Sequence, residues 1–300
     1  MARPRGRVWR RTSWAAVAAA TMACSSSSRA GAGGADAGTD SPGDEAPACL
    51  AASACVQSPT AGQECVTTMD ATMLDALGAP VVGLPVFVCG TNLCSEPVKT
   101  AADGTVGVAV CLPFAGPALK VFSDPAYVPF AALLTGAGPS FSVGTVTIVR
   151  LPGTGAPLAT GSGTVSSGPV SLTLDGTTVT FDVEHATPDA QMFRAAPVAA
   201  SALPGSLAGG VTAAWGLAPL NTTLVPPAQL TLPNDPKWPA GAAVDVYANG
   251  TDPAAIPPAP PWGSWGLLGT GAVTSDGGSI VLTSAQGGLP AIAMVGVKLH

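Results

Sequence analysis

Histidine is almost missing from this sequence, which limits the chemistry that the chain can carry out. Its 300 residues include two histidines, His185 and His300, and unperturbed histidine is the side chain that titrates near neutral pH. His300 ends the sequence, where a side chain is rarely held rigidly. A Ser-His-Asp arrangement would therefore depend on His185, and no Gly-x-Ser-x-Gly motif supplies its serine. We expect a protein without enzymatic activity.

Motifs that bind nucleotides or metals are missing as well. There is no Gly-x-x-x-x-Gly-Lys phosphate loop, and "GTGAPL" and "GTGAVT" are incomplete relatives of the dinucleotide fingerprint. Asp182 and Glu184 precede His185, but in a strand the two carboxylates share one face and the histidine points to the other. We therefore expect no metal and no cofactor, and a calcium ion bound by a loop is the open alternative.

Charged residues make up only 10% of the chain, and most of them are acidic. Five of the 12 basic residues are arginines within the first 13 positions. Without them, 7 basic residues stand against 18 acidic ones, which gives a net charge of −11. Binding to nucleic acid needs clustered cations, and electrostatic docking on anionic lipid needs them too. The composition argues against both kinds of partner.

Helical periodicity is nearly absent, because 30 prolines and 37 glycines recur too often for long helices. Apolar residues instead alternate with polar ones, which is the pattern of half-buried strands. The sequence therefore predicts an all-β fold. The residues that we expect to point inward are Val106, Val108, Val110, Leu112, Val170, Leu172, Leu174, Val179, Phe181, Val183, Val244 and Val246.

Asp-Gly pairs mark three expected hairpins, since both residues tolerate the positive φ of type I′ turns. The pairs are Asp103-Gly104, Asp175-Gly176 and Asp276-Gly277. Short strands separated by turns about every ten residues are typical of β-sandwiches and barrels. We predict a first β-sandwich over 65–150, a Gly/Pro/Ser-rich linker over 151–169 and a second β-sandwich over 170–300.

The first 23 residues have the composition of a secretory signal peptide, with a basic start, the apolar run "WAAVAAA" and small residues before Cys24. The run is shorter than the roughly 20 apolar residues that span a bilayer. Residues 24–64 begin with a tether rich in Ser, Gly and acidic residues and contain several cysteines. We therefore expect export, with the mature chain beginning near Cys24.

"MAC", residues 22–24, resembles the cleavage site of bacterial lipoprotein signals, in which the cysteine after the cut becomes diacylglycerated. The resemblance implies a lipid anchor on Cys24. Thr21 departs from the leucine that is usual in this family. Cleavage by ordinary signal peptidase is one alternative, and the Arg10-Arg11 pair leaves twin-arginine export as another.

The seven cysteines agree with such an anchor, because an odd number in an exported chain leaves one over. If Cys24 carries lipid, six remain for three disulfides. We expect Cys89 and Cys94 to pair first, because the tight turn "GTNL" separates them. The expected remaining pairs are Cys49 with Cys55 and Cys65 with Cys111.

Two stretches resemble known β-modules. "DALGAPVVGLPVFVCG" followed by "VKTAADGTVGVAV" resembles carboxypeptidase-regulatory-like and transthyretin-like β-sandwiches. "LTLPNDPKWPAGAAVDVYANG" followed by "GSWGLLGTGAVTSDGGSI" resembles the Ig-like modules of large bacterial surface proteins. These resemblances imply a fold and a location but no chemistry, since such modules are mostly stalks, adhesive domains or assembly parts.

Tryptophans of the second predicted sandwich are the remaining binding candidates, because exposed rings can stack on sugars or contact proteins. Trp262, in "PPAPPWGSWG", is expected to be exposed, and Trp238 is the second candidate. We expect Trp265 to be mostly buried over Gly269 and Gly271, together with Leu267, Val273, Ile280 and Leu282 as apolar neighbours.

The sequence thus predicts an exported protein of the outer membrane or cell surface, lipid-anchored through Cys24, with the periplasmic face as the alternative location. Its expected role is structural or interactive, and its partners are the membrane, through acyl chains, and a protein or glycan. The alternative function is a carbohydrate- or protein-binding adhesion module that uses the Trp-bearing loops. A divergent hydrolase would have to rely on His185.

Overall fold

The computed structural model describes residues 55, 58–136, 138–182, 185, 187–252 and 260–300. These described residues form one compact unit. Its regular structure in the described ranges consists of 18 β-strands and four short 3-10 helices, without an α-helix. The all-β prediction is therefore confirmed. Cys24, Cys49, the predicted signal peptide and most of the predicted tether lie outside the described residues.

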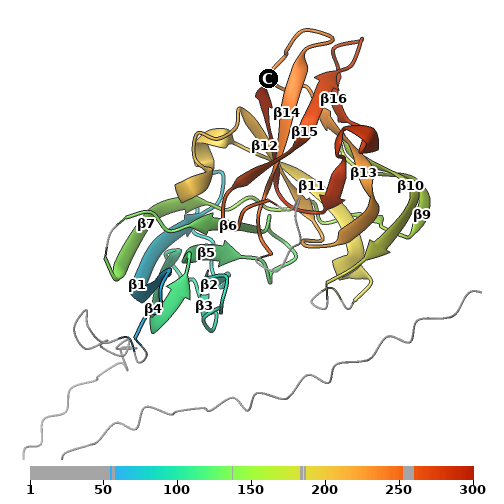
Figure 1. The fold of residues 1–300 in the computed structure, drawn as a ribbon. Helices are drawn as coiled ribbons and strands as arrows, with labels where there is room; N and C mark the ends of the chain where they lie inside the picture. The colour runs from blue at the N-terminus through green and yellow to red at the C-terminus, as the bar shows by residue number, and fades with distance from the viewer. Residues whose placement is uncertain (1–54, 56–57, 137, 183–184, 186, 253–259) are drawn as a thin grey trace, which may run out of the picture. The chain divides into compact units, whose positions relative to one another are not determined.

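Strands β1–β7 form the N-terminal half of this unit, residues 63–151, as two sheets around one core (Figure 1). The first sheet has the order β4-β1-β7, with β1 antiparallel to β4 and parallel to β7. The second sheet has the order β3-β2-β5-β6 and is antiparallel throughout. The strands are β1 (Gln63–Leu74), β2 (Pro85–Cys89), β3 (Val98–Lys99), β4 (Thr105–Ala115), β5 (Ala118–Val121), β6 (Phe130–Leu133) and β7 (Ser140–Thr147).

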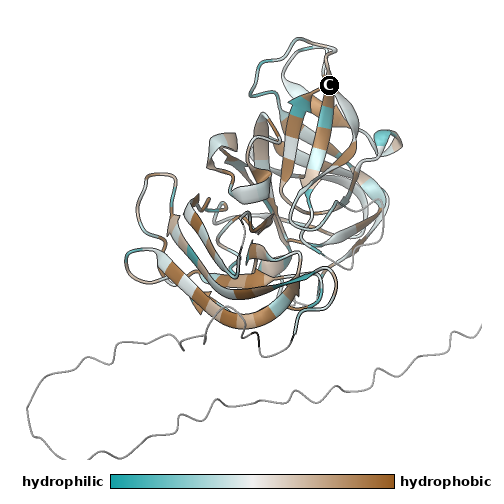
Figure 2. Cartoon of the chain, turned by 60° about the vertical axis from the view of Figure 1, so that its left-hand side comes forward, coloured by the Kyte–Doolittle hydropathy of each residue, from teal (hydrophilic) through white to brown (hydrophobic). Residues whose placement is uncertain are grey.

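Hydrophobic residues alternate along β1 and in the first part of β4, so that one side of this sheet faces the core (Figure 2). Val106 and Val108 are buried, as predicted. Val110 and Leu112 are only half-buried. The β1–β4 register shifts between Val66 and Thr68, and a bulge of this kind changes which side chains face inward.

Strands β8–β18 form the C-terminal half, residues 152–300. They share one continuous sheet with the order β8-β11-β12-β18-β14-β15-β16-β13-β10-β9, and β17 pairs with β13 beside this path. The strands are β8 (Ala156–Pro157), β9 (Gly161–Ser167), β10 (Val170–Thr180), β11 (Met192–Val198), β12 (Ala213–Ala218), β13 (Thr223–Pro233), β14 (Ala243–Asn249), β15 (Trp265–Val273), β16 (Ser279–Leu282), β17 (Leu289–Ala291) and β18 (Val295–Leu299).

The continuous path differs from the two separate sheets of the predicted Ig-like sandwich. The backbone N–H of Ala195 in β11 donates to Ser167 Oγ in β9 at 2.9 Å, so the sheet curls until strands from its two ends meet. The predicted inward residues Val170, Leu172, Leu174, Val244 and Val246 are all buried inside this curl. Val179 and Phe181 are half-buried, and Val183 lies outside the described residues.

The stretch 151–169, which we predicted as a linker, contains β8 and β9 in the structure. Leu151, Leu158 and Val165 are buried, and β9 pairs antiparallel with β10. A Gly/Pro/Ser-rich stretch here forms an edge strand with tight turns. Composition alone does not distinguish such a strand from a flexible segment.

The three predicted Asp-Gly turns have different outcomes. Asp276-Gly277 joins β15 to β16, which pair with each other, so this hairpin is confirmed. Asp103-Gly104 forms a turn from β3 into β4, but these two strands belong to different sheets. The hairpin at Asp175-Gly176 is wrong, since both residues lie inside β10, where the register with β9 and β13 shifts.

Strands β11 and β12 connect two hydrophobic cores. Ala196 and Ala214 pack into the core of the N-terminal half, whereas Ala195 and Trp215 pack into the core of the C-terminal half. Alternation sends successive side chains to opposite faces of a strand. This part of the large sheet is therefore covered on both faces, and the two halves share it.

Candidate functional site

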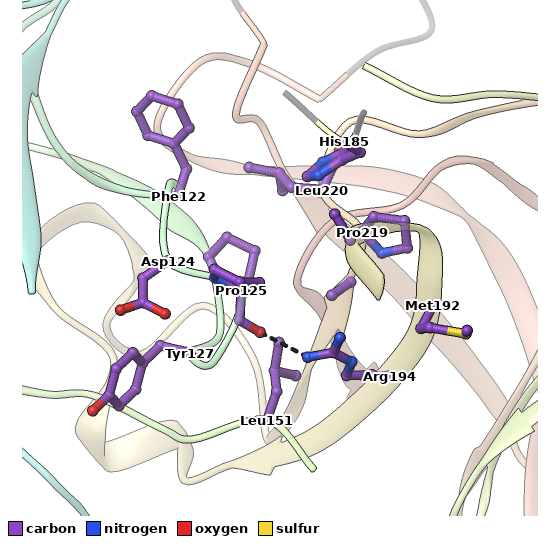
Figure 3. A pocket seen from close by; sticks show the side chains of 13 residues that line it. Phe122, Asp124, Pro125, Tyr127, Leu151, His185, Met192, Arg194, Pro219 and Leu220 are labelled. Atoms are coloured by element: carbon purple, nitrogen blue, oxygen red, sulfur yellow. Dashed lines mark hydrogen bonds between the residues drawn. The ribbon is translucent and has the colours of Figure 1, made fainter. Parts of the chain in front are cut away.

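A small pocket lies where the two halves meet (Figure 3). Residues from both halves line it, including Phe122, Tyr127, His185, Arg194 and Leu220. Its cavity volume is about 20 Å³, which is enough for roughly one water molecule. The pocket holds His185, the one internal histidine, but has no room for a substrate.

His185 takes part in the hydrogen bonding around this pocket. Its Nε2 lies 2.8 Å from the carbonyl oxygen of Leu220, so Nε2 carries the proton and donates it. The backbone carbonyl of His185 accepts a hydrogen bond from Gln191 Nε2 at 2.9 Å. Among the residues that the structure describes, no group of three His, Cys, Asp or Glu side chains could hold a metal ion. The geometry thus gives His185 a structural contact.

Arg194 ties the C-terminal half to the N-terminal half at the same place. Its Nη1 donates to the backbone carbonyl of Pro125 at 3.1 Å, and its Nη2 donates to that of Asp189 at 2.7 Å. The first of these bonds is drawn in Figure 3. Nε of Arg194 is buried without a hydrogen-bond partner in the described part of the chain.

Asn249, at the end of β14, makes the most specific contact between the halves. Its Oδ1 accepts a hydrogen bond from the Ala131 N–H at 2.9 Å, and its Nδ2 donates to the Ala131 carbonyl at 2.8 Å. The side-chain amide thus pairs with the edge of β6 as a neighbouring strand would. Asn249 is 1% exposed, so water cannot replace these two bonds.

Further hydrogen bonds surround this contact. The N–H of Leu133 lies 2.9 Å from Ser206 Oγ and 3.1 Å from the carbonyl oxygen of Gly263, and the hydroxyl of Ser206 donates to the same Gly263 carbonyl. Each buried polar group that is paired in this way avoids a desolvation cost of about 1–3 kcal/mol. The junction is therefore built from matched polar groups within a packed interface.

Trp262, the first of the candidate tryptophans, contributes to the same junction. The indole N–H of Trp262 donates to the Gly116 carbonyl at 2.8 Å, and the Lys120 ammonium lies 5.6 Å from the centre of its ring. The same ammonium lies 4.1 Å from the Phe122 ring. Both the polar atom and one face of Trp262 therefore have partners inside the protein.

Trp265 lies beside the junction. Its N–H donates to the Leu207 carbonyl at 3.0 Å, and its ring packs against the N-terminal core. Trp265 and Trp262 are both half-buried, so the predicted contrast in exposure is not seen. The ring fits beside Gly210, where a Cβ would come within 3.0 Å of Trp265 Nε1. The predicted packing over Gly269 and Gly271 is wrong, since these glycines lie against Gln286 and Val281.

Trp238, the second binding candidate, lies far from Trp262. It is half-buried against the C-terminal core and precedes β14, whereas Trp262 forms a bridge with Gly250, just after β14. The seven residues of β14 separate them by roughly 23 Å. The two rings therefore do not form a common binding surface.

The outer face of the sheet β4-β1-β7 carries an open hollow of about 340 Å³. Asp70, Thr72, Thr105, Gly107 and Ser142 are among the residues that line it. The hollow has a carboxylate and hydroxyl groups but no aromatic ring among its lining residues. Its chemistry is that of an ordinary solvated sheet face.

The C-terminal His300 is held more firmly than we predicted. Its Nδ1 lies 2.8 Å from Asp245 Oδ1, and its N–H donates to the Ala243 carbonyl at 3.1 Å. Thr270 Oγ1 also donates to Asp245 Oδ1 at 2.8 Å. Burial raises the pKa of Asp245, but the hydrogen bonds from His300 and Thr270 outweigh this effect and hold the pKa below its usual value.

This arrangement predicts a small loss of stability at acidic pH. A carboxylate whose pKa is lowered by folding contributes stability above its unfolded pKa and loses this contribution as the pH falls through the folded pKa. We expect Asp245→Asn to lower the free energy of unfolding by less than about 1 kcal/mol at pH 7. The difference from the wild type should vanish below the ordinary pKa of 3.8, as measured by urea denaturation at each pH.

Asp235→Asn is the control for this prediction, because Asp235 is an exposed residue of the same half. It removes one carboxylate without touching His300. If Asp245→Asn and the control showed the same pH profile, the contact between Asp245 and His300 would not contribute.

Two disulfides lie within the described residues. Cys89 is bonded to Cys94, as predicted. Cys55 is bonded to Cys65, so the predicted pairs Cys49–Cys55 and Cys65–Cys111 are wrong. Cys55 comes close to the start of β1, next to Cys65, and the spacing of cysteines did not reveal this turn. Cys111 is also disulfide-bonded.

Comparisons with known proteins give no family for this chain. No family model matches the sequence, and no curated protein is significantly similar to it. Within the described residues, the structure contains no helix of the length and hydrophobicity needed to cross a membrane.

Proposed function

We propose that this protein is exported, is held to a membrane by acyl chains on Cys24, and acts as a rigid interaction or structural module without catalysis. One observation supports the proposal of a structural module without catalysis. Two of the side chains that sequence analysis singled out for chemistry or ligand binding have structural partners in the protein. His185 is hydrogen-bonded to Leu220 within the C-terminal half, and Trp262 donates to Gly116 across the junction between the halves. A rigid junction suits a module that presents surfaces to a partner.

The disulfides support export. Cys55–Cys65 and Cys89–Cys94 are both formed, and Cys111 is bonded too. Structural disulfides persist in oxidising compartments such as the periplasm or the cell surface, and are rare in the cytosol. The seventh cysteine, Cys24, is then the one that we assign to the lipid, at the outer membrane or cell surface.

The proposal includes the resemblance to known β-modules, and the two halves support it to different degrees. The two sheets of the N-terminal half suit a carboxypeptidase-regulatory-like or transthyretin-like sandwich. The curled sheet of the C-terminal half offers less support for an Ig-like module. The alternative of glycan binding by the Trp-bearing loops is weakened, because Trp262 is engaged internally and Trp238 lies at the other end of β14.

The lipid anchor makes a direct prediction. Cells that produce the protein should incorporate labelled palmitate into it, and Cys24→Ala should abolish the label and release the protein into the soluble fraction. Two or more acyl chains anchor stably, because each buried CH₂ contributes about 0.8 kcal/mol. Ser25→Ala, one position further along, should change neither result. An unlabelled wild-type protein whose mature N-terminus lies elsewhere would refute the anchor.

A further inference from the structure

The loop between β1 and β2 presents hydrophobic residues to solvent. Leu77 is 94% exposed and Val82 is 60% exposed. Residues 76–80 are all exposed, and so is the neighbouring Ala101-Ala102 pair. We call residues 76–80, Val82 and Ala101-Ala102 the apolar apex. Single exposed apolar residues are common on proteins, whereas a contiguous group of them marks an interaction surface.

The apex is held in one conformation. Asp75 Oδ1 accepts hydrogen bonds from the N–H groups of Leu77 and Ala79 at 2.8 and 2.9 Å. Gly78 has a φ of 81°, which closes this turn with little strain because glycine has no Cβ. Leu77 therefore projects from a rigid turn. A surface that is ordered before binding loses less conformational entropy when a partner docks.

Backbone hydrogen bonds also hold the residues that follow the exposed turn. The N–H of Val81 donates to the Met73 carbonyl, and that of Gly83 donates to the Thr100 carbonyl, both at 3.0 Å. Val81 itself is buried at 4% exposure. The fold thus buries one valine of the Val81-Val82 pair and leaves the other outside with Leu77.

Acidic residues flank the apex on both sides. Asp75 directly precedes residues 76–80, and the nearest basic residue in the sequence is Lys99. Asp103 directly follows the Ala101-Ala102 pair and is exposed. Hydrogen bonds from Thr105 lower the pKa of Asp103, so its carboxylate stays ionised. A complementary partner surface would carry cations around an apolar centre.

The position of the apex separates it from the N-terminal tether. The tether enters at the start of β1 and the apex follows its end. The 12 residues of β1 span about 40 Å. A chain anchored through residues before β1 would thus carry the apex away from its point of attachment.

We infer that the apolar apex is a docking surface for a separate protein whose binding site is an apolar socket with a cationic rim. This inference deepens the proposed interaction role and rests on it. A second copy of this chain is a poor occupant, because the chain without its five N-terminal arginines has a net charge of −11 and like charges oppose docking. An anionic membrane is disfavoured for the same reason.

The test uses the full-length protein in the cells that export it. A photo-crosslinking amino acid replaces Leu77 in one variant and Leu299, which is 48% exposed on β18, in the control. We expect a covalent adduct with one protein at position 77 and none at position 299. That protein is then purified and its Kd for the wild-type chain is measured.

Substitutions then establish the chemistry of the contact. Leu77→Ser should raise the Kd about 10- to 100-fold, since a buried leucine is lost. Val225→Ser, at a residue that is 59% exposed in the C-terminal half, should leave the Kd unchanged. Asp103→Asn should raise the Kd at low salt and have no effect at 0.5 M NaCl. All variants should melt at the wild-type temperature, because these side chains are exposed.

Several results would overturn the inference. These are no adduct at position 77 above the control, a Kd that Leu77→Ser leaves unchanged, or a Kd that does not respond to salt. Self-association in sedimentation that Leu77→Ser abolishes would assign the apex to a dimer, and binding to phosphatidylglycerol vesicles that it abolishes would assign it to lipid. Cys24→Ala should not alter the Kd of the purified chain, so failure of the anchor and failure of the apex can be distinguished.

Discussion

Replacing Asn249 with alanine is expected to lower the free energy of unfolding by about 2–6 kcal/mol. The substitution leaves both the N–H and the carbonyl of Ala131 without a partner in a buried place. Each unsatisfied buried group costs about 1–3 kcal/mol. The urea midpoint, followed by tryptophan fluorescence and circular dichroism, should fall by a corresponding amount.

Asn92 provides a matched control for this prediction. It makes the same kind of two-sided contact with β4, since its Nδ2 donates to Pro113 at 3.0 Å and its Oδ1 accepts from Ala115 at 2.9 Å. Asn92 is exposed, so water can replace the lost bonds in Asn92→Ala. We expect a cost below about 1 kcal/mol there. Equal costs for the two variants would show that burial of Asn249 is not what matters.

Asn249→Asp separates the two hydrogen bonds. An ionised aspartate still accepts the Ala131 N–H, but it places a negative charge against the Ala131 carbonyl, to which Asn249 Nδ2 donates in the wild type. We expect this variant to be at least as unstable as Asn249→Ala at neutral pH, because an uncompensated buried charge costs several kcal/mol. Wild-type stability of Asn249→Asp would contradict the donor role of the amide.

Much of the strand content could be predicted, because alternation follows directly from the two-residue period of a strand. Val106, Leu172 and Val246 are buried where the pattern placed them. Leu267 is 54% exposed instead of buried. The β14–β15 register shifts between Val246 and Tyr247, and a bulge moves every later side chain to the other face. Periodicity in the sequence does not record where such bulges fall.

The error at Asp175-Gly176 has a similar cause. Gly176 has a φ of 61°, which suits a type I′ turn and a bulge equally well. Alternating residues on both sides are therefore compatible with two strands or with one kinked strand. The pairing of both parts of β10 with β9 and β13 decides for one strand, and only tertiary structure supplies that information.

The junction between the halves could not be predicted from the sequence. Asn249 and Ala131 are 118 positions apart, and an asparagine near the end of a strand also suits a turn. The apolar apex was closer to detection, because a leucine between Asp75 and Gly78 is unusual for a turn that must face water. The resemblance to carboxypeptidase-regulatory-like sandwiches assigned this stretch to a common strand-turn-strand pattern, so the exposed leucine was not singled out.

Gly216 of β12 is the second residue on which the junction depends. It is buried, and a Cβ at this position would lie 2.7 Å from Val128 Cβ and still closer to its two methyl groups. Val128 is 3% exposed in the N-terminal core, so it cannot turn away. We expect Gly216→Ala to lower the free energy of unfolding by about 1–3 kcal/mol, as overpacking does in other cores, measured again by urea denaturation.

A double-mutant cycle attributes this loss to the contact with Val128. Val128→Ala removes the two methyl groups nearest to the new Cβ, so the double variant should be more stable than the sum of the single effects predicts, by about 0.5–3 kcal/mol. Gly153→Ala is the control, because Gly153 has no heavy atom within 4 Å of its ideal Cβ and should be neutral or slightly stabilising. Strictly additive effects in the cycle would mean that Gly216 is required for a reason other than the close approach of the two halves.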